Sequence, residues 1–260
     1  MKIQKVIDAI ELWTPTNQSE EFDNVGLIIG NSDNDITGVI VSLDTTEKII
    51  DEAIEKNCNL IVSFHPIIFK GLKKLTSNSY VEKTIIKAIE NKVSIYSIHT
   101  SLDNHAEGVN YVISKKLGLI NTKILIPKEN NKYIGMGRIG ELKKCLNENE
   151  FIIYLKDKMK TNLIRHSRFI GKKIKRIAVL GGSGAFGIDK AISQNADAYV
   201  TADLKYHNFF EANNKIVLFD IGHFESEQFT KNLIHNYLSK KFPSFAIVLA
   251  TTNTNPVNYF

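Results

Sequence analysis

Short apolar runs that alternate with amphipathic segments constrain the fold of this chain more than any other feature of its sequence. In the first half, these runs have the length and the Val and Ile content of buried strands. The predicted strands are 27–30, 38–43, 59–64 and 93–98. Amphipathic segments at 47–56 and 80–91 predict helices that connect the later strands. Strands that alternate with helices indicate a parallel sheet with right-handed crossover connections.

The second half of the chain restarts this alternation after a less regular stretch. Its predicted strands are 176–180, 197–201, 216–219 and 245–250. A polar stretch near 126–134 breaks the periodicity and suggests a domain boundary. We therefore expect an α/β protein with two α/β domains built on mixed or parallel sheets. The first would comprise 1–126 together with 221–260, and the second would comprise 127–220, including a glycine loop.

Polar residues with metal-binding side chains follow two of the predicted strands in the first half. His65 follows the strand 59–64, His99 follows the strand 93–98, and Asp103 lies four residues beyond His99. In parallel sheets, ligands collect at the carboxyl ends of the strands. We therefore expect these three side chains to lie at one edge of a sheet.

The segment 220–227 contains a second group of possible metal ligands. It follows an apolar run and opens the amphipathic segment 224–238, so a strand would deliver His223 to the start of a helix. His223 and Glu227 are four residues apart and would share one helix face. Imidazole and carboxylate ligands without thiolates suit Zn, Mn or Fe and the activation of bound water. The alternative is a helix N-terminus that favours acidic residues, with His223 as a polar cap.

Two further patterns precede this segment, and each has competing interpretations. Gly182, Gly184 and Gly187 fit a dinucleotide-binding fingerprint, with Asp203 about twenty residues further on, which would predict an NAD-dependent oxidoreductase. The alternative is a tight strand-to-helix turn that requires glycine. Asp203 and His207 are four residues apart on a predicted helix. They would orient a metal ligand there or act as an acid–base pair. A helix cap with a surface histidine is the other interpretation.

Composition narrows the class of protein. The net charge of +5 arises from 33 basic and 28 acidic residues spread along the chain, so nucleic-acid binding is not indicated. Cys58 and Cys145 lie far apart, which predicts neither a disulfide framework nor a thiolate zinc site. No apolar run approaches the length of a membrane span, and the first helix does not resemble a signal peptide. We expect a cytoplasmic protein that does not enter the membrane.

Several motifs, in their order along the chain, resemble the Nif-three-like family, often labelled GTP cyclohydrolase I type 2 homologues. The resemblance covers nearly the whole chain and matches the short form of the family. The motifs are 22–27 (FDNVGL), 63–69 (SFHPIIF), 99–103 (HTSLD), 181–184 (GGSG), 201–207 (TADLKYH) and 220–227 (DIGHFESE).

The resemblance implies two α/β domains, a toroidal hexamer, and a dinuclear metal centre in a cleft between the domains at the strand ends. The metal ligands carried over by position are His65, Asp103, His223 and Glu227. Glu227 would bridge the ions, whereas His99 and His207 would line the cleft as candidate catalytic residues. The family usually carries histidine where this chain has Phe64. One expected ligand is therefore absent, and one or two divalent ions per subunit are expected.

These expectations lead to a functional hypothesis. As a member of this family, the protein would be a metal-dependent hydrolase that uses activated water on a nucleotide or a phosphorylated small molecule, and the family label names GTP. The alternative is a non-catalytic metal-binding or regulatory scaffold whose ring assembly presents surfaces to partner proteins.

Overall fold

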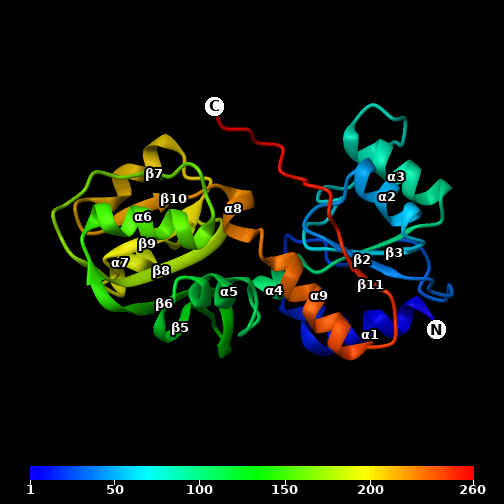
Figure 1. Cartoon of the computed structure of the whole chain (residues 1–260), viewed down its shortest axis with the longest axis horizontal. Coiled ribbons are helices and arrows are strands. Elements are labelled where there is room, and N and C mark those ends of the chain that lie inside the picture. Colours follow the sequence, from blue (N-terminus) through cyan, green and yellow to red (C-terminus); the bar gives the residue numbers. More distant parts are fainter. The chain divides into compact units, whose positions relative to one another are not determined.

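The computed structural model describes residues 1–260 and contains two α/β units (Figure 1). The first unit consists of Met1–Leu102 and Thr230–Pro256, and the second consists of Asp103–Phe229 and Val257–Phe260. Each unit contains one mixed β-sheet. The predicted α/β class with mixed sheets is confirmed.

The first unit has a five-stranded sheet with the order β1-β4-β3-β2-β11. Its strands are β1 (Gly26–Ile29), β2 (Val39–Ser42), β3 (Leu60–Ser63), β4 (Ser94–Ser97) and β11 (Ile247–Leu249). All neighbouring strands are parallel except β1, which runs antiparallel to β4. Every residue of β2, β3 and β4 is buried, as expected for central strands of a parallel sheet that is covered on both faces.

Helices cover this sheet on two sides. They are α1 (Ile3–Trp13), α2 (Glu47–Glu55), α3 (Tyr80–Glu90) and α9 (Thr230–Lys241), with a short 3₁₀ turn η1 (Thr16–Gln18) after α1. Figure 1 shows α2 and α3 beside each other on one side of the sheet and α1 and α9 on the other. Local sequence fixes two of the helix starts, because Thr46 caps α2 and Ser79 caps α3 through side-chain oxygens that accept backbone N–H groups.

The second unit has a six-stranded sheet with the order β5-β6-β8-β9-β10-β7. Its strands are β5 (Ile120–Lys128), β6 (Asn131–Leu146), β7 (Arg165–His166), β8 (Ile174–Ser183), β9 (Ala198–Ala202) and β10 (Val217–Asp220). The pairs β8–β9 and β9–β10 are parallel, and the others are antiparallel. The helices that follow or pack on it are α5 (Val109–Lys116), α6 (Glu148–Met159), α7 (Ile188–Ser193) and α8 (His223–Glu227), with the 3₁₀ helices η2 (Ala185–Gly187) and η3 (Tyr206–Ala212).

The two units differ from the predicted domains in three segments. The prediction placed 103–126, 221–229 and 257–260 in the first domain, whereas all three belong to the second unit. The physical reasons are that β5 pairs with β6 in the second sheet, α5 packs on β6 and β8, and α8 packs on β8. After α9 the chain returns to the first sheet, where β11 pairs with β2.

The helix predicted over 224–238 is interrupted in the structure. α8 ends at Glu227 and α9 begins at Thr230, where the chain passes from the second unit to the first. The amide of Gln228 in this junction donates hydrogen bonds to the carbonyl oxygens of Met159 and Glu225. None of the helices combines the length and the apolar character that a membrane crossing requires.

A buried carboxylate ties α2 to the segment that follows β11. Glu52 accepts hydrogen bonds from the Lys56 ammonium group at 2.6 Å, from the Thr251 backbone at 2.8 Å and from the Thr252 backbone at 3.0 Å. Burial alone would raise the pKa of Glu52, but these hydrogen bonds outweigh it and hold that pKa well below its usual range. The ionised form of Glu52 therefore stabilises the first unit.

Replacing Glu52 with glutamine should lower the free energy of unfolding at pH 7 by about 1–3 kcal/mol, because the buried donors lose a charged acceptor. The folded-state pKa is depressed, so this stabilisation is present above the unfolded pKa of about 4.3 and is lost as the pH falls below it. Urea unfolding at pH 7 and pH 3.5 measures the effect, with Glu55→Gln on the exposed side of α2 as the control. A difference between wild type and Glu52→Gln that does not shrink in acid contradicts this account.

Candidate functional site

Strand register brings polar side chains together at the carboxyl edge of the first sheet. β2, β3 and β4 are parallel, and Ser42, Ser63 and Ser97 are paired across them. The residues two positions beyond these serines are Asp44, His65 and His99. The three strands end at these serines, so all three residues follow at the same edge of the sheet. This edge therefore presents a carboxylate and two imidazoles side by side, as the sequence predicted for the two histidines.

Each of these histidines is oriented by a carboxylate. Nδ1 of His65 lies 2.8 Å from Oδ1 of Asp44, and Nδ1 of His99 lies 2.7 Å from Oδ1 of Asp23, which precedes β1. The two imidazole rings are 5.4 Å apart. A carboxylate on Nδ1 fixes the ring and leaves Nε2 as the atom that can bind a metal ion or accept a proton.

Asp23 is held in its charged form by its surroundings. Its side chain is fully buried, and it also accepts hydrogen bonds from the backbone N–H and the hydroxyl group of Thr100. Burial raises the pKa of Asp23, but the hydrogen bond to His99 and the bonds from Thr100 outweigh this and lower it. A stable carboxylate at this position keeps the His99 ring in one orientation.

Phe64 lies between these groups in the interior. It is fully buried, and its ring centroid is 4.9 Å from that of His65 and 5.5 Å from that of His99. The phenyl ring packs against both imidazoles and offers no ligand atom. Position 64 therefore contributes apolar packing to the core and no ligand for a metal ion.

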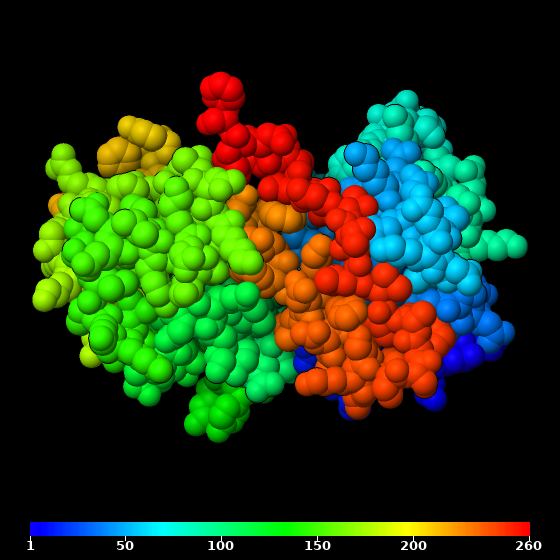
Figure 2. All heavy atoms as spheres, viewed as in Figure 1, coloured from blue at the N-terminus to red at the C-terminus, as the bar shows by residue number.

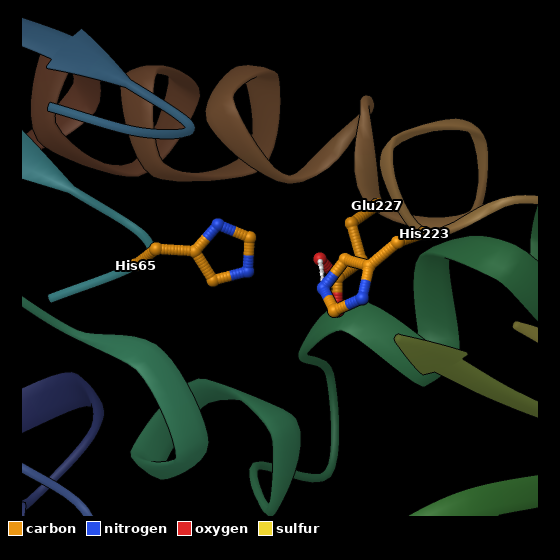
Figure 3. Close-up of side chains that lie close together, drawn as sticks. All are labelled: His65, His223 and Glu227. Carbon is orange, nitrogen blue, oxygen red and sulfur yellow. Dashed lines mark ion pairs between the residues drawn. The ribbon is translucent and has the colours of Figure 1, made fainter. Parts of the chain in front are cut away.

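In the second unit, α8 carries the other predicted pair. Gly222 has a φ of 91°, which lets the chain turn from β10 into a helix that begins at His223. Nε2 of His223 lies 3.1 Å from a carboxylate oxygen of Glu227, one turn further along, and Figure 3 shows this ion pair. Nδ1 of His223 lies 2.8 Å from Oδ2 of Asp203, to which the Ser183 hydroxyl also donates. The prediction that His223 and Glu227 share one helix face is confirmed.

The charges around His223 favour its imidazolium form. Burial alone would lower the pKa of His223, but the hydrogen bonds to Asp203 and Glu227 and the charges of these carboxylates raise it to about 11. The bond to His223 in turn lowers the pKa of Asp203. An ion that binds Nε2 of His223 must displace a proton, as is usual for histidine ligands.

The glycine loop packs directly against α8. Gly182, at the end of β8, has a φ of 69°, and a Cβ atom there would collide with Oε1 of Glu227. The Gly182 N–H donates to the Ser226 hydroxyl at 2.9 Å. Glu227 itself is only 3% exposed. Glycine at this position therefore makes room for the Glu227 carboxylate.

The other glycines of the fingerprint are explained by a tyrosine. Cβ atoms on Gly184 and Gly187 would collide with the hydroxyl group of Tyr199, which is buried and donates a hydrogen bond to the Gly184 carbonyl oxygen at 2.7 Å. The predicted partner of a ribose, Asp203, instead binds His223. These contacts agree with the interpretation of a tight turn and give no support to a dinucleotide site.

The predicted pairing of Asp203 with His207 on one helix is wrong. Asp203 precedes η3 with a φ of 56° and directs its carboxylate to His223. His207 lies exposed on η3, with its ring 5.2 Å from that of Tyr206 and 6.2 Å from that of Phe210. A turn with positive φ replaces the predicted helix and separates the two side chains.

The remaining predicted ligand, Asp103, ends the short helix α4 (His99–Asp103), which begins at His99.

The sequence analysis did not identify Asp23 and Asp44 as partners of the histidines. Asp44 had a usable signal, because it follows β2 just as His65 follows β3, whereas Asp23 reaches His99 from a loop with no such signal. His65, His223 and Glu227, drawn in Figure 3, are side chains of the kind that can supply ligand atoms to a metal ion.

These features define a class: an α/β protein with two mixed sheets and with histidine and glutamate side chains that could bind a metal ion. A family model described as Duf34/NIF3 (NGG1p interacting factor 3) matches residues 1–256. The chain belongs to this family, and the resemblance found in its motifs is confirmed.

Individual relatives agree with this assignment. A Clostridium acetobutylicum protein named GTP cyclohydrolase 1 type 2 homolog is 36% identical over 231 residues, which cover 87% of this chain and 85% of that protein. A Campylobacter jejuni protein of the same name is 34% identical over 265 residues and is matched along the whole of both chains.

Solved structures show the same fold. A Staphylococcus aureus hypothetical protein superposes with a TM-score of 0.91 at 30% identity, covering 100% of this chain and 99% of the other. A Bacillus cereus protein related to NIF3 superposes with a TM-score of 0.94 at 23% identity, with the same coverage, which supports the fold alone.

The contact between Gly182 and Glu227 can be tested by adding a methyl group. Gly182→Ala should lower the free energy of unfolding by more than Gly171→Ala, because both positions have similar φ values of 69° and 73° but only position 182 has a neighbour in the way. A positive φ alone costs about 1–3 kcal/mol. Urea unfolding of both variants measures the free energy of unfolding that the collision with Glu227 costs. Combining Gly182→Ala with Glu227→Ala should recover part of that free energy. Equal losses at the two glycines would show that Gly182 makes no room for Glu227.

Proposed function

We propose that this protein binds divalent metal ions and is a metal-dependent hydrolase that acts on a nucleotide or a phosphorylated small molecule. The observation that carries the proposal is a repeated pairing. His65, His99 and His223 each hold a carboxylate on Nδ1, the arrangement that metal-binding and proton-accepting histidines adopt. The relatives named GTP cyclohydrolase 1 type 2 homolog support a nucleotide as the substrate.

The proposed ligands combine imidazole and carboxylate groups. They are His65, Asp103, His223 and Glu227. Such a set, without thiolates, suits Zn, Mn or Fe. The fit of the residues rests on two observations: Asp44 and Asp203 contact Nδ1 of His65 and His223, and Nε2 of His223 lies 3.1 Å from the carboxylate of Glu227, the other proposed ligand on α8. Because Phe64 supplies no imidazole, we expect one ion to bind tightly and a second to have fewer protein ligands.

When bound, the metal ion would supply Lewis acidity and activate water for attack on the substrate. The protein's own contribution to proton transfer would come from His99. Its Nδ1 is held by the buried Asp23 carboxylate, so Nε2 is the acceptor atom of the neutral ring. His207 is the second candidate. Its ring is exposed on η3 and contacts the rings of Tyr206 and Phe210, so its contacts there are aromatic and not with a carboxylate. We therefore rank His99 first.

The assembly and the compartment are part of the same proposal. By family resemblance we propose a homohexamer in the cytoplasm. The two cysteines support a reducing compartment, because Cys58 and Cys145 are both free thiols.

Metal content tests the proposal directly. The purified protein should retain a divalent ion after dialysis at neutral pH, and His223→Ala and Glu227→Ala should each lose most of it, since each removes a ligand. Inductively coupled plasma mass spectrometry gives the content per chain. His235→Ala is the control, because that ring contacts only the Ile247 carbonyl oxygen through Nε2. A wild-type protein without bound metal, together with no change in the variants, would falsify the metal site.

The carboxylates behind the histidines should also affect affinity. Asp44→Asn and Asp203→Asn should weaken metal binding by about 10- to 100-fold, because each loses the charge that orients and activates its imidazole. Competition with a fluorescent chelator measures the dissociation constants. Asp189→Asn, at an exposed position on α7, should leave them unchanged. Unchanged affinity in both test variants would mean that these pairs have a structural role only.

Turnover separates the enzyme from the non-catalytic scaffold. The metal-loaded protein should hydrolyse at least one compound in a panel of GTP, other nucleotides and phosphoesters, and His99→Ala should lower kcat while retaining the metal. If the metal-loaded wild-type protein hydrolyses none of these compounds, the result favours the non-catalytic scaffold over the enzyme.

A further inference from the structure

A buried asparagine in the second unit joins two backbone segments that are far apart in the sequence. Asn110 lies on α5 and is only 4% exposed. Its Oδ1 atom accepts a hydrogen bond from the N–H of Gly181, near the end of β8, at 3.0 Å, and its Nδ2 atom donates one to the carbonyl oxygen of Asp103 at 3.4 Å. A backbone N–H can only donate and a carbonyl oxygen can only accept, so these two partners fix the orientation of the amide.

The sequence of α5 presents Asn110 to β8. The buried residues of this helix are Val109, Asn110, Ile113 and Ser114, which lie on one side of it, and Figure 2 shows the outer side of the segment, in green, at the surface of the second unit. A Cβ atom on Gly181 would lie 3.0 Å from a side-chain carbon of Ile113 and 3.2 Å from one of Val109. Glycine therefore lets α5 come close enough to β8 for Asn110 to reach its backbone.

Helix α8 binds the next residue of β8. The N–H of Gly182 donates to the Ser226 hydroxyl group at 2.9 Å, and this hydroxyl group donates to the carbonyl oxygen of His223 at 2.8 Å. A Cβ atom on Gly181 would also lie 3.5 Å from Cγ of Glu227. Two successive backbone N–H groups at the end of β8 are thus held by side chains from α5 and from α8.

Most of the proposed metal ligands belong to this connected set. They are Asp103, His223 and Glu227, all in the second unit. The hydrogen bonds to Asp103 and His223 end on backbone carbonyl oxygens, so these bonds hold the backbones and do not use the carboxylate or the imidazole. Because Phe64 contributes no ligand, the relative positions of these three side chains matter more for holding an ion.

We propose that Asn110 is a positioning residue of the metal site: it fixes the Asp103 backbone against the end of β8 and thereby sets the Asp103 carboxylate relative to the ligands on α8. This inference rests on the proposed function and adds to it a residue that touches neither metal nor substrate. Ligands that are held in place before the ion arrives bind it more tightly, because less freedom is lost on binding. The alternative is that Asn110 only satisfies the buried N–H of Gly181 and contributes to stability.

Three variants of α5 separate these two roles. Asn110→Leu keeps the volume and removes both hydrogen bonds, whereas Asn110→Ser leaves room for a water molecule and should fold even if the leucine variant does not. Both should weaken metal binding by about 10-fold, the lower end of the range for groups behind a ligand, as measured by competition with a fluorescent chelator. Ser114→Ala is the matched control and should leave the affinity unchanged, because Ser114 is fully buried on the same side of α5 but its hydroxyl group donates to the Tyr111 carbonyl oxygen.

Two readouts distinguish positioning from stability. In the cobalt-substituted protein, the visible absorption bands depend on the geometry of the ligands, so they should shift in both Asn110 variants and stay unchanged in Ser114→Ala, whatever the free energy of unfolding. Asp103→Ala should weaken binding by itself. Adding Asn110→Ser to it should weaken binding little further, because the effect of Asn110 passes through Asp103.

Hydrogen exchange of the metal-free protein tests the link to β8 itself. The peptide that contains Gly181 and Gly182 should exchange faster in both Asn110 variants than in the wild-type protein, since the Gly181 N–H loses its acceptor. Mass spectrometry measures this exchange. Equal exchange in all three proteins would show that Asn110 does not hold β8, and would overturn the inference without any measurement of metal.

Unchanged affinity and unchanged cobalt bands in both Asn110 variants would overturn the positioning role, as would an equal loss of affinity in Ser114→Ala or full additivity with Asp103→Ala. The metal content of the wild-type protein is measured on the same samples. Normal metal content with any of these results overturns only the role of Asn110, whereas a wild-type protein that holds no metal overturns the proposed function and this inference with it.

Discussion

The in-register pairing of three parallel strands is the constraint on which the candidate site depends. Because Ser42, Ser63 and Ser97 are paired across β2, β3 and β4, Asp44, His65 and His99 follow at equal distances from the same row. A shift of one residue in any strand would turn its polar residue to the other face of the sheet. The close packing of these buried strands opposes such a shift, because side chains of different size would have to exchange places in a covered core. The hydrophobic core therefore determines where the imidazoles lie.

Carboxylate–imidazole pairs recur in both units, although the elements that build them differ. In the first unit, Asp44 and His65 come from adjacent strand ends, whereas Asp23 reaches His99 from a loop. In the second, Asp203 follows β9 and meets His223 at the start of α8, after β10. In each pair the carboxylate contacts Nδ1 of the ring, and Nε2 of His223 lies 3.1 Å from the Glu227 carboxylate. The shared position of the carboxylate on Nδ1 supports a common role for these histidines more strongly than their presence in the sequence does.

The fold and the positions of the histidines could be predicted because they depend on local patterns. Apolar runs located the strands, and the residues that end them named His65 and His99. Asp44 could have been found in this way, but Asp23 could not, because Asp23 and His99 are 76 residues apart and meet only when β1 pairs with β4. The positive φ value at Asp203 redirects the chain where the sequence predicted a helix. The assignment of β5 likewise depended on its pairing with β6, which the residue pattern of the segment does not encode.

We propose that Nε2 of the carboxylate-bound histidines and the Glu227 carboxylate bind divalent metal ions. Crystals of the protein grown with Zn or Mn and measured at the absorption edge of that metal would test it most directly. We expect anomalous peaks about 2.0–2.2 Å from Nε2 of His65 in the first unit, and from Nε2 of His223 and a carboxylate oxygen of Glu227 in the second, with Asp44 and Asp203 still on Nδ1. A metal-loaded crystal with no peak at these atoms, or with the ion on Nδ1 in place of the carboxylates, would contradict it.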